Sequence, residues 1–273
     1  MIDLHLHTAA SDGALSPAEL VSRAAAAGLT TISITDHDTL AGIPEARVAA
    51  AGLGLRLVPG VEITGVEDER DVHLLAYFVD VDAPGLAGFL ERQRTDRLRR
   101  LREIAGRLSA LGFAIELEPL LEQAGATAGR SVGRPLLADA LVAAGHARDR
   151  NDAFDRLLGN RGPAYVPRVG ATPDEVIDIV RRAGGIVSLA HPGLTRMDGL
   201  IPRLAEAGLA ALEVGHSDHD PETERRYREL AARYGLAVSA GSDFHADSGH
   251  RISALGRVTL AAGEFERLEA RVP

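Results

Sequence analysis

The chain has 273 residues, enough to bury the core of one barrel-sized domain that carries an insertion. It has no cysteine, which excludes disulfides and thiolate metal sites, and its 30 basic residues are all arginine, which excludes Schiff-base chemistry and a P-loop lysine. The formal net charge of −9 argues against broad adhesion to nucleic acid, so we expect no DNA-binding surface.

A transmembrane helix is not expected, because no stretch approaches the ~18 to 20 uninterrupted apolar residues that a bilayer crossing needs. The N-terminus begins Ile2-Asp3-Leu4-His5, without the basic region and apolar core of a signal peptide. We therefore expect a cytoplasmic protein without membrane contact, and no feature indicates an obligate protein partner.

Short apolar runs alternate with helical patterns from the start of the chain. Residues 2–6 and 31–35 predict strands, and between them Ser16 and Pro17 begin a helix that ends at Gly28. Further strands are predicted over residues 55–58, 72–78, 185–189, 210–214 and 237–240, and further helices begin near residues 172 and 220. This alternation is typical of parallel βα units in an α/β fold.

The alternation stops between about residues 84 and 168. This part of the chain reads as several helices, over residues 87–111, 118–123, 135–144 and 152–158. We therefore predict a discontinuous barrel made of residues 1–83 and 169–273, with a helical insertion over residues 84–168 that contributes substrate-binding arginines.

Histidines and carboxylates follow nearly every predicted strand, and the carboxyl ends of parallel strands meet at one edge of a fold. One histidine after a strand is more often a hydrogen-bonding residue than a ligand, but its recurrence favours a shared site. Imidazoles and carboxylates suit divalent metals, which can hold a phosphate ester and make hydroxide from water. The segments are Asp3-Leu4-His5-Leu6-His7, Thr35-Asp36-His37-Asp38, Gly60-Val61-Glu62, His73, Ala190-His191-Pro192 and Gly241-Ser242-Asp243-Phe244-His245.

His5 and His7 carry the most weight, because alternate residues of a strand share a face and both rings can point toward one ion. Asp3 is a candidate for orienting one of the rings, or for forming a turn at the strand end.

Together with Ser11-Asp12-Gly13, these segments resemble the motifs of the polymerase-and-histidinol-phosphatase (PHP) family, at both ends of the chain. The resemblance implies a distorted (β/α)7 barrel with two or three divalent metal ions as cofactors, manganese being expected and iron or zinc being alternatives. It implies a first ion on His5, His7, Glu62 and Asp243, a second on Glu62, His73 and His191, and a third on Asp12, His37 and His245.

Three acidic residues near these motifs also have a plainer interpretation. Ser11-Asp12-Gly13 is a common turn sequence, in which the aspartate bonds its own backbone. Asp36 and Asp38 flank His37 and either could orient an imidazole, but a solvated turn is the simpler expectation, so both stay outside the ligand set.

Arginines recur in the helix predicted over residues 87–111. Arg94, Arg97 and Arg100 are spaced by three residues and so lie near one face. Such a charge run is usually a solvated face. Arginines in the matching helix of PHP phosphatases that act on nucleotides favour phosphate binding by Arg97 and Arg100.

Arg134 stands at a loop-to-helix junction, where a guanidinium and free backbone amides could meet one phosphate. Relatives usually carry a histidine two residues later and often a second arginine beyond it. This chain has Leu136 and Asp139 there, so its substrate contacts differ in detail.

His216 and His219 follow a predicted strand and could contact phosphate, protonate the leaving oxygen, or cap the next helix. We assign the general acid to His219, because relatives carry a histidine in the matching Ser-x-His region, and phosphate contact to His216 and His37. His191 and Asp243 are assigned to catalysis as well as to metal binding.

The predicted reaction is attack of a metal-bridging hydroxide on a phosphomonoester, with cations and arginines neutralising the phosphoryl charge. Within the family the chain looks most like stand-alone phosphoesterases that act on nucleoside 3′,5′-bisphosphates and on the 5′ ends of short RNA. Two arginine clusters suit a substrate with two phosphates. Histidinol-phosphate phosphatase, an amidohydrolase-type C–N hydrolase and a noncatalytic metal-binding module are the alternatives.

Overall fold

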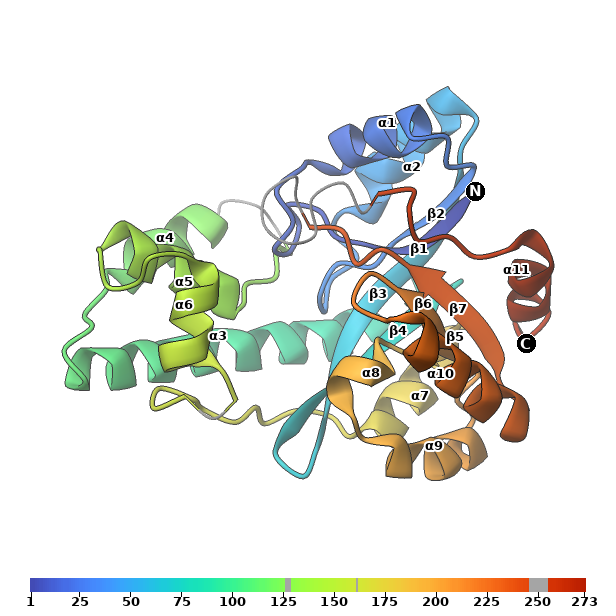
Figure 1. The fold of residues 1–273 in the computed structure, drawn as a ribbon. Coiled ribbons are helices and arrows are strands. Elements are labelled where there is room, and N and C mark those ends of the chain that lie inside the picture. The colour runs from blue at the N-terminus through green and yellow to red at the C-terminus, as the bar shows by residue number, and fades with distance from the viewer. Residues whose placement is uncertain (126–128, 161, 246–254) are drawn as a thin grey trace.

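The computed structural model describes residues 1–125, 129–160, 162–245 and 255–273. In this part of the chain seven strands form one sheet in chain order, and the last strand returns beside the first (Figure 1). The His7 N–H donates to the Phe244 carbonyl at 2.9 Å across that junction. The predicted barrel is confirmed as a nearly closed one. Its strands are β1 (Ile2–Leu6), β2 (Thr31–Ile34), β3 (Arg56–Glu67), β4 (Arg70–Tyr77), β5 (Ile186–Leu189), β6 (Ala211–His216) and β7 (Ala237–Gly241).

The approach of β7 to β1 depends on a glycine. A Cβ atom on Gly241 would lie 2.3 Å from the Cβ of His5 and 2.5 Å from its backbone nitrogen, closer than any side chain tolerates. Gly241 therefore lets the end of β7, and the Asp243 that follows it, sit directly against the strand that carries His5.

The order of parallel strands is interrupted at β4, which is antiparallel to both β3 and β5. The predicted parallel βα units do not include β4, because only Asp68 and Glu69 separate β3 from β4, and a parallel return needs a dozen or more residues. Asp68 and Glu69 have φ of 48° and 59°, as a tight two-residue hairpin turn requires.

Helices cover the outside of the barrel. The predicted start of α1 is confirmed by a reciprocal cap, in which the Glu19 N–H donates to Ser16 Oγ and the Ser16 N–H donates to the Glu19 carboxylate. Four unpredicted helices, α2, α8, α9 and α11, begin without a side-chain cap. The helices are α1 (Pro17–Ala26), α2 (Ile43–Leu53), α7 (Pro173–Arg182), α8 (Pro192–Thr195), α9 (Ile201–Ala207), α10 (Pro221–Arg233) and α11 (Ala262–Glu269), with a 3₁₀ turn at Asp198–Leu200.

The segment between β4 and α7 contains the remaining helices, which lie together on one side of the barrel (Figure 1). They bury an apolar cluster of their own, with Leu101, Ile104, Leu137, Leu141 and Leu157 in it. The division into barrel and insertion stays a prediction that this separate cluster supports. The helices are α3 (Leu86–Ala110), α4 (Leu117–Gly125), α5 (Arg134–Ala143) and α6 (Arg150–Ala153), followed by a π-helical turn at Phe154–Leu158.

None of the helices in the described part of the chain combines the length and the apolar character that crossing a bilayer requires.

Candidate active site

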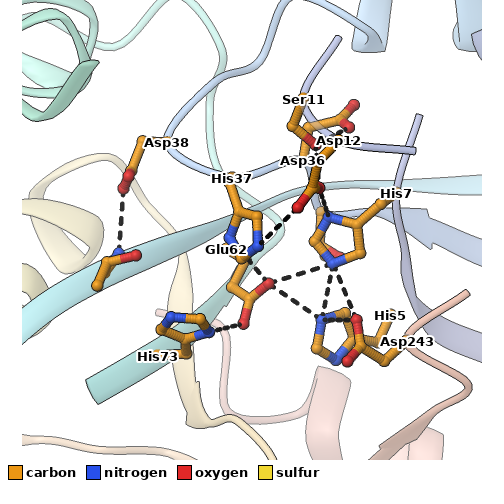
Figure 2. A network of polar contacts seen from close by, with 12 residues as sticks. His5, His7, Ser11, Asp12, Asp36, His37, Asp38, Glu62, His73 and Asp243 are labelled. Carbon is orange, nitrogen blue, oxygen red and sulfur yellow. Dashed lines mark hydrogen bonds and ion pairs between the residues drawn. The ribbon is translucent and has the colours of Figure 1, made fainter. Parts of the chain in front are cut away.

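Glu62 is the centre of a buried cluster inside the barrel mouth, and five histidines lie within 3.2 Å of its carboxylate oxygens. Figure 2 shows four of these histidines around it. The distances from Oε2 are 3.2 Å to His5 Nε2, 3.2 Å to His7 Nε2 and 3.2 Å to His37 Nδ1, and those from Oε1 are 2.7 Å to His73 Nδ1 and 3.2 Å to His191 Nε2.

Glu62 and His73 owe their proximity to the antiparallel pair β3 and β4. Thr64 lies opposite His73, and Glu62 lies two residues before Thr64 on the same face, so the Glu62 and His73 side chains are diagonal neighbours. The prediction that Glu62 follows a strand end was wrong, because β3 extends past it, whereas His73 lies within β4 as the strand predicted over residues 72–78 has it. The hairpin nevertheless brings them together.

The described ligand atoms form sets whose members lie within 4.8 Å of one another. The set predicted for the first ion recurs unchanged. The set predicted for the third ion recurs with His7 added, and Glu62 with His73 recurs with His37. His191 is outside that set but contacts the same Glu62 oxygen as His73. The assignment of ligands to individual ions stays a prediction. The sets are His5, His7, Glu62 and Asp243; His37, Glu62 and His73; His7, Asp12, His37 and His245; and His5, Glu213 and His216, the last of which was not predicted from the sequence.

The protonation states of the cluster fit divalent ions. Burial lowers the pKa of His37 to about 3 despite the nearby Glu62, so this imidazole is neutral. Burial opposes ionisation of Glu62, but the imidazoles around it hold its pKa well below its usual range. Burial also opposes protonation of His7, yet Asp243 and Glu62 raise its pKa to about 10, so a cation bound there displaces a proton.

Unpaired nitrogens in the cluster also fit metal binding. The Nδ1 atoms of His7 and His191 are buried and have no hydrogen-bond partner among the described residues. A buried polar atom without a partner is costly, and a lone pair directed at a cation removes that cost. Imidazole nitrogen with carboxylate oxygen is a donor set that manganese, iron and zinc all accept.

Glu213 orients the cluster and was missed from the sequence. Its Oε1 lies 2.9 Å from His5 Nδ1, and its Oε2 accepts the His191 N–H at 2.7 Å. Asp3, the predicted orienting residue, instead accepts the backbone N–H groups of Ser242 and His5. The signal that could have revealed Glu213 is an acidic residue in the otherwise apolar strand β6, because a carboxylate buried in a strand is unfavourable without a partner.

Asp36 and Asp38 are both buried, so the expectation of a solvated turn was wrong. Asp36 accepts hydrogen bonds from the Thr8 N–H and the Ser11 hydroxyl, each at 2.7 Å, and thereby fixes the loop before Asp12.

Asp38 binds two arginines that come from distant parts of the chain. Its Oδ2 lies 2.5 Å from Arg97 Nε and 3.2 Å from Arg168 Nη2, while its Oδ1 accepts the Thr64 N–H at 3.0 Å. Burial opposes ionisation of Asp38, but the two guanidiniums outweigh it and lower the pKa to about 2. Arg168 was missed from the sequence because it lies outside the arginine-rich helix.

A second carboxylate, Asp71, binds the other two arginines. Its Oδ2 lies 3.0 Å from Arg100 Nη1 and 3.5 Å from Arg134 Nη2. Arg134 also donates to the Leu158 carbonyl at 3.1 Å and to Asn160 Oδ1 at 2.9 Å.

One cavity joins the arginines to the histidine cluster. Four guanidiniums and two imidazoles of the barrel therefore line a single space. Arg97, Arg100 and Arg134 are among them, and their binding of phosphate stays a prediction. Arg94 contacts the Asp38 carbonyl instead, and Arg102 forms an exposed pair with Glu118. The charged and imidazole residues that line the cavity are Asp12, His37, Asp71, His73, Arg97, Arg100, Arg134 and Arg168.

His216 and His219 lie beside the cluster, and neither is among the residues that line this cavity. His216 Nε2 is 3.3 Å from Asp243 Oδ2. His219 Nδ1 lies 2.8 Å from the Val214 carbonyl, and its Nε2 accepts the Gly193 N–H at 3.2 Å. The alternative that these histidines cap α10 is wrong, because Asp220 is the cap.

Three residues at or beside the cluster have a strained backbone. Asp38, His191 and Asp243 have φ of 52°, 27° and 52°, in the region that non-glycine residues avoid. Such conformations persist where the surrounding structure enforces them, and they are common at functional sites.

Comparison with known proteins agrees with this geometry. A family model described as PHP domain matches residues 3–118. The chain is 37% identical over 250 residues to a Salmonella typhimurium protein named 5′-3′ exoribonuclease Rnm, covering 89% of this chain and 84% of that protein. It is 34% identical over 250 residues to a Chromobacterium violaceum protein named 3′,5′-nucleoside bisphosphate phosphatase, covering 90% of this chain and 87% of that protein.

The fold matches the crystal structure of a candidate metal-dependent phosphoesterase from Bifidobacterium adolescentis, with a TM-score of 0.89 and 36% identity. The match covers 100% of this chain and 96% of that one. The sequence motifs, the barrel fold and these relatives, which match over most of both chains, all indicate the same family. The chain therefore belongs to the PHP family, and it is a metal-dependent phosphoesterase.

Proposed function

We propose that this protein removes phosphate from nucleotides, acting on nucleoside 3′,5′-bisphosphates and on the 5′ ends of short RNA. The observation that carries the proposal is the cavity in which Arg97, Arg100, Arg134 and Arg168 face His37 and His73. A histidinol phosphate or an amide substrate has no second anionic group to occupy so many guanidiniums. The names of the two relatives support the same class of substrate.

The metal-binding residues would be those of the buried cluster, holding two or three divalent ions, with manganese as the proposed metal. Bound ions supply positive charge to the phosphoryl oxygens and lower the pKa of water. Glu62 reaches five histidines through two oxygens, so it can bridge neighbouring ions. Glu213 holds the His5 ring, which preserves the geometry of the first set.

The arginines bind and orient the substrate. Asp38 and Asp71 each hold two guanidiniums, so each group keeps a net positive charge toward the cavity. Hydrogen bonds between guanidinium and phosphate are strong because both partners are charged. The carboxylates restrict the arginine rotamers before the substrate arrives, which reduces the entropy lost on binding.

His219 is the proposed general acid, a role worth about 10²- to 10⁴-fold in rate. Burial lowers the pKa of this imidazole, and its Nε2 accepts a backbone N–H in the described structure. The role therefore requires His219 to gain a proton and to release Gly193 when substrate binds.

The purified protein with manganese should release phosphate from adenosine 3′,5′-bisphosphate faster than from L-histidinol phosphate, and should not hydrolyse a C–N substrate. Phosphate release is measured colorimetrically, with metal content determined on the same sample. An equal rate for the two phosphate esters, or a faster one for histidinol phosphate, would contradict the nucleotide assignment.

Arg97→Ala is expected to raise KM for the bisphosphate by at least about tenfold with a smaller change in kcat, since binding of the non-reacting group is lost equally in ground and transition states. Steady-state kinetics provide the measurement. Arg102→Ala is the matched control on the same helix, because Arg102 is exposed and outside the cavity. A change confined to kcat would argue against a binding role for Arg97.

A further inference from the structure

Two buried polar atoms beside the cavity lack partners. Asp71 Oδ1 and Arg100 Nη2 have no hydrogen-bond partner among the described residues. Arg100 is 6% exposed, and both residues line the cavity. A buried carboxylate oxygen and a buried guanidinium N–H are both costly to leave unpaired, and such groups in a cavity point to a ligand.

Asp71 differs in this respect from the other carboxylate that holds arginines. Both oxygens of Asp38 have partners, since Oδ1 accepts the Thr64 N–H and Oδ2 contacts Arg97 and Arg168. Asp71 uses only Oδ2, for Arg100 and Arg134. If Asp71 served only to neutralise arginines, there would be no reason for its Oδ1 to lack a hydrogen-bond donor.

The Arg100 guanidinium is held in place by protein contacts. Its Nε donates to the Val166 carbonyl at 2.7 Å, its Nη1 donates to Asp71 at 3.0 Å, and its plane lies over the Tyr165 ring at 5.4 Å. These three contacts fix the guanidinium and with it the position of Nη2. Arg134 makes the longest contact to Asp71, 3.5 Å, and is 20% exposed, so it is the side chain that can shift to admit a group.

The two atoms define the chemistry of that group. A phosphate oxygen would suit Arg100 but would be repelled by Asp71, and an ammonium group would suit Asp71 but would be repelled by the arginines. A hydroxyl both donates and accepts, so it satisfies the two atoms together. Asp71 and His73 lie two residues apart on one face of β4, which places this position next to the proposed metal ligands.

We propose that Asp71 and Arg100 recognise the ribose 2′-hydroxyl of the substrate, which is the free ribose hydroxyl of a nucleoside 3′,5′-bisphosphate, an inference that rests on the proposed action on nucleotides. Asp71 Oδ1 accepts the hydroxyl proton, and Arg100 Nη2 donates to the hydroxyl oxygen. The site distinguishes ribonucleotides from deoxyribonucleotides, a selection that the phosphate-binding arginines cannot make.

Calorimetric binding of adenosine 5′-monophosphate and its 2′-deoxy and 3′-deoxy analogues to the purified, metal-analysed protein tests this site. The recovered nucleotide is checked for an intact phosphate. Loss of the 2′-hydroxyl should weaken binding by about tenfold or more, as for other hydrogen bonds to charged groups, whereas loss of the 3′-hydroxyl should not. Asp71→Ala should bring the affinities of all three ligands within about twofold of one another, because the hydroxyl then has no anionic acceptor.

Asp139→Ala is the control, since Asp139 forms an exposed pair with Arg150 and does not line the cavity, and it should keep the wild-type ratio. Equal affinities in the wild-type protein, or a ratio that persists in Asp71→Ala, would overturn the hydroxyl site while phosphate release from nucleotides stands. Failure of all three ligands to bind, with no release from any nucleotide, would overturn both proposals.

Discussion

Glu62→Gln is expected to reduce kcat/KM by more than about 100-fold, beyond the ~10- to 100-fold cost of losing a group that only orients a metal ligand. The substitution keeps the size of the side chain but removes the charge that five imidazoles contact. Neighbouring ions would then share no anionic ligand. Metal content by mass spectrometry and phosphate release on the same sample measure both effects.

Glu67→Gln is the matched control for this variant, because Glu67 lies on the same strand and pairs with Arg203 at the surface. It should retain both metal and activity. A Glu62→Gln protein that is folded by circular dichroism, binds a full complement of manganese and turns over normally would refute the bridging role.

Asp38→Ala is expected to lower the free energy of unfolding by about 3–5 kcal/mol, the range for breaking a buried ion pair from one side. Asp38 is fully buried, and Arg168 is 1% exposed, so neither Arg168 nor the adjacent Arg97 can recover its solvation. Urea unfolding monitored by circular dichroism gives the value. KM for nucleotides should rise as well, because both guanidiniums lose their fixed position.

The comparison for Asp38→Ala is Asp178→Ala on α7, which removes an exposed pair with Arg182. That substitution should change the unfolding free energy by no more than about 0.5 kcal/mol. Similar losses in the two variants would show that the Asp38 contacts contribute no more than a surface pair.

Local patterns predicted much of the barrel and many of the residues that meet at the candidate site. His5 and His7 alternate along a strand, so their shared face followed from the period of two. Ser16 and Glu19 marked the start of α1 through a cap that needs only neighbouring residues. These features were predictable because each depends on residues close together in the chain.

Residues whose roles depend on distant partners were not predictable. Glu213 meets His5 across the barrel, and Arg168 meets Asp38, so neither has a motif around it. The turn at Asp68 and Glu69 has positive φ without glycine, and it gave no hairpin signal. In each case tertiary packing selected the conformation or the partner.

The Asp38 carboxylate comes from the loop after β2, whereas Arg97 lies on α3 and Arg168 follows the helical segment. The proposed phosphate-binding surface is thus shared between a part of the chain that carries the proposed metal ligands and a part that carries few of them. Exchange of α3 to α6 between relatives would alter which molecules are accepted while leaving the catalytic core untouched. This arrangement offers evolution, and protein engineers, a separable handle on selectivity.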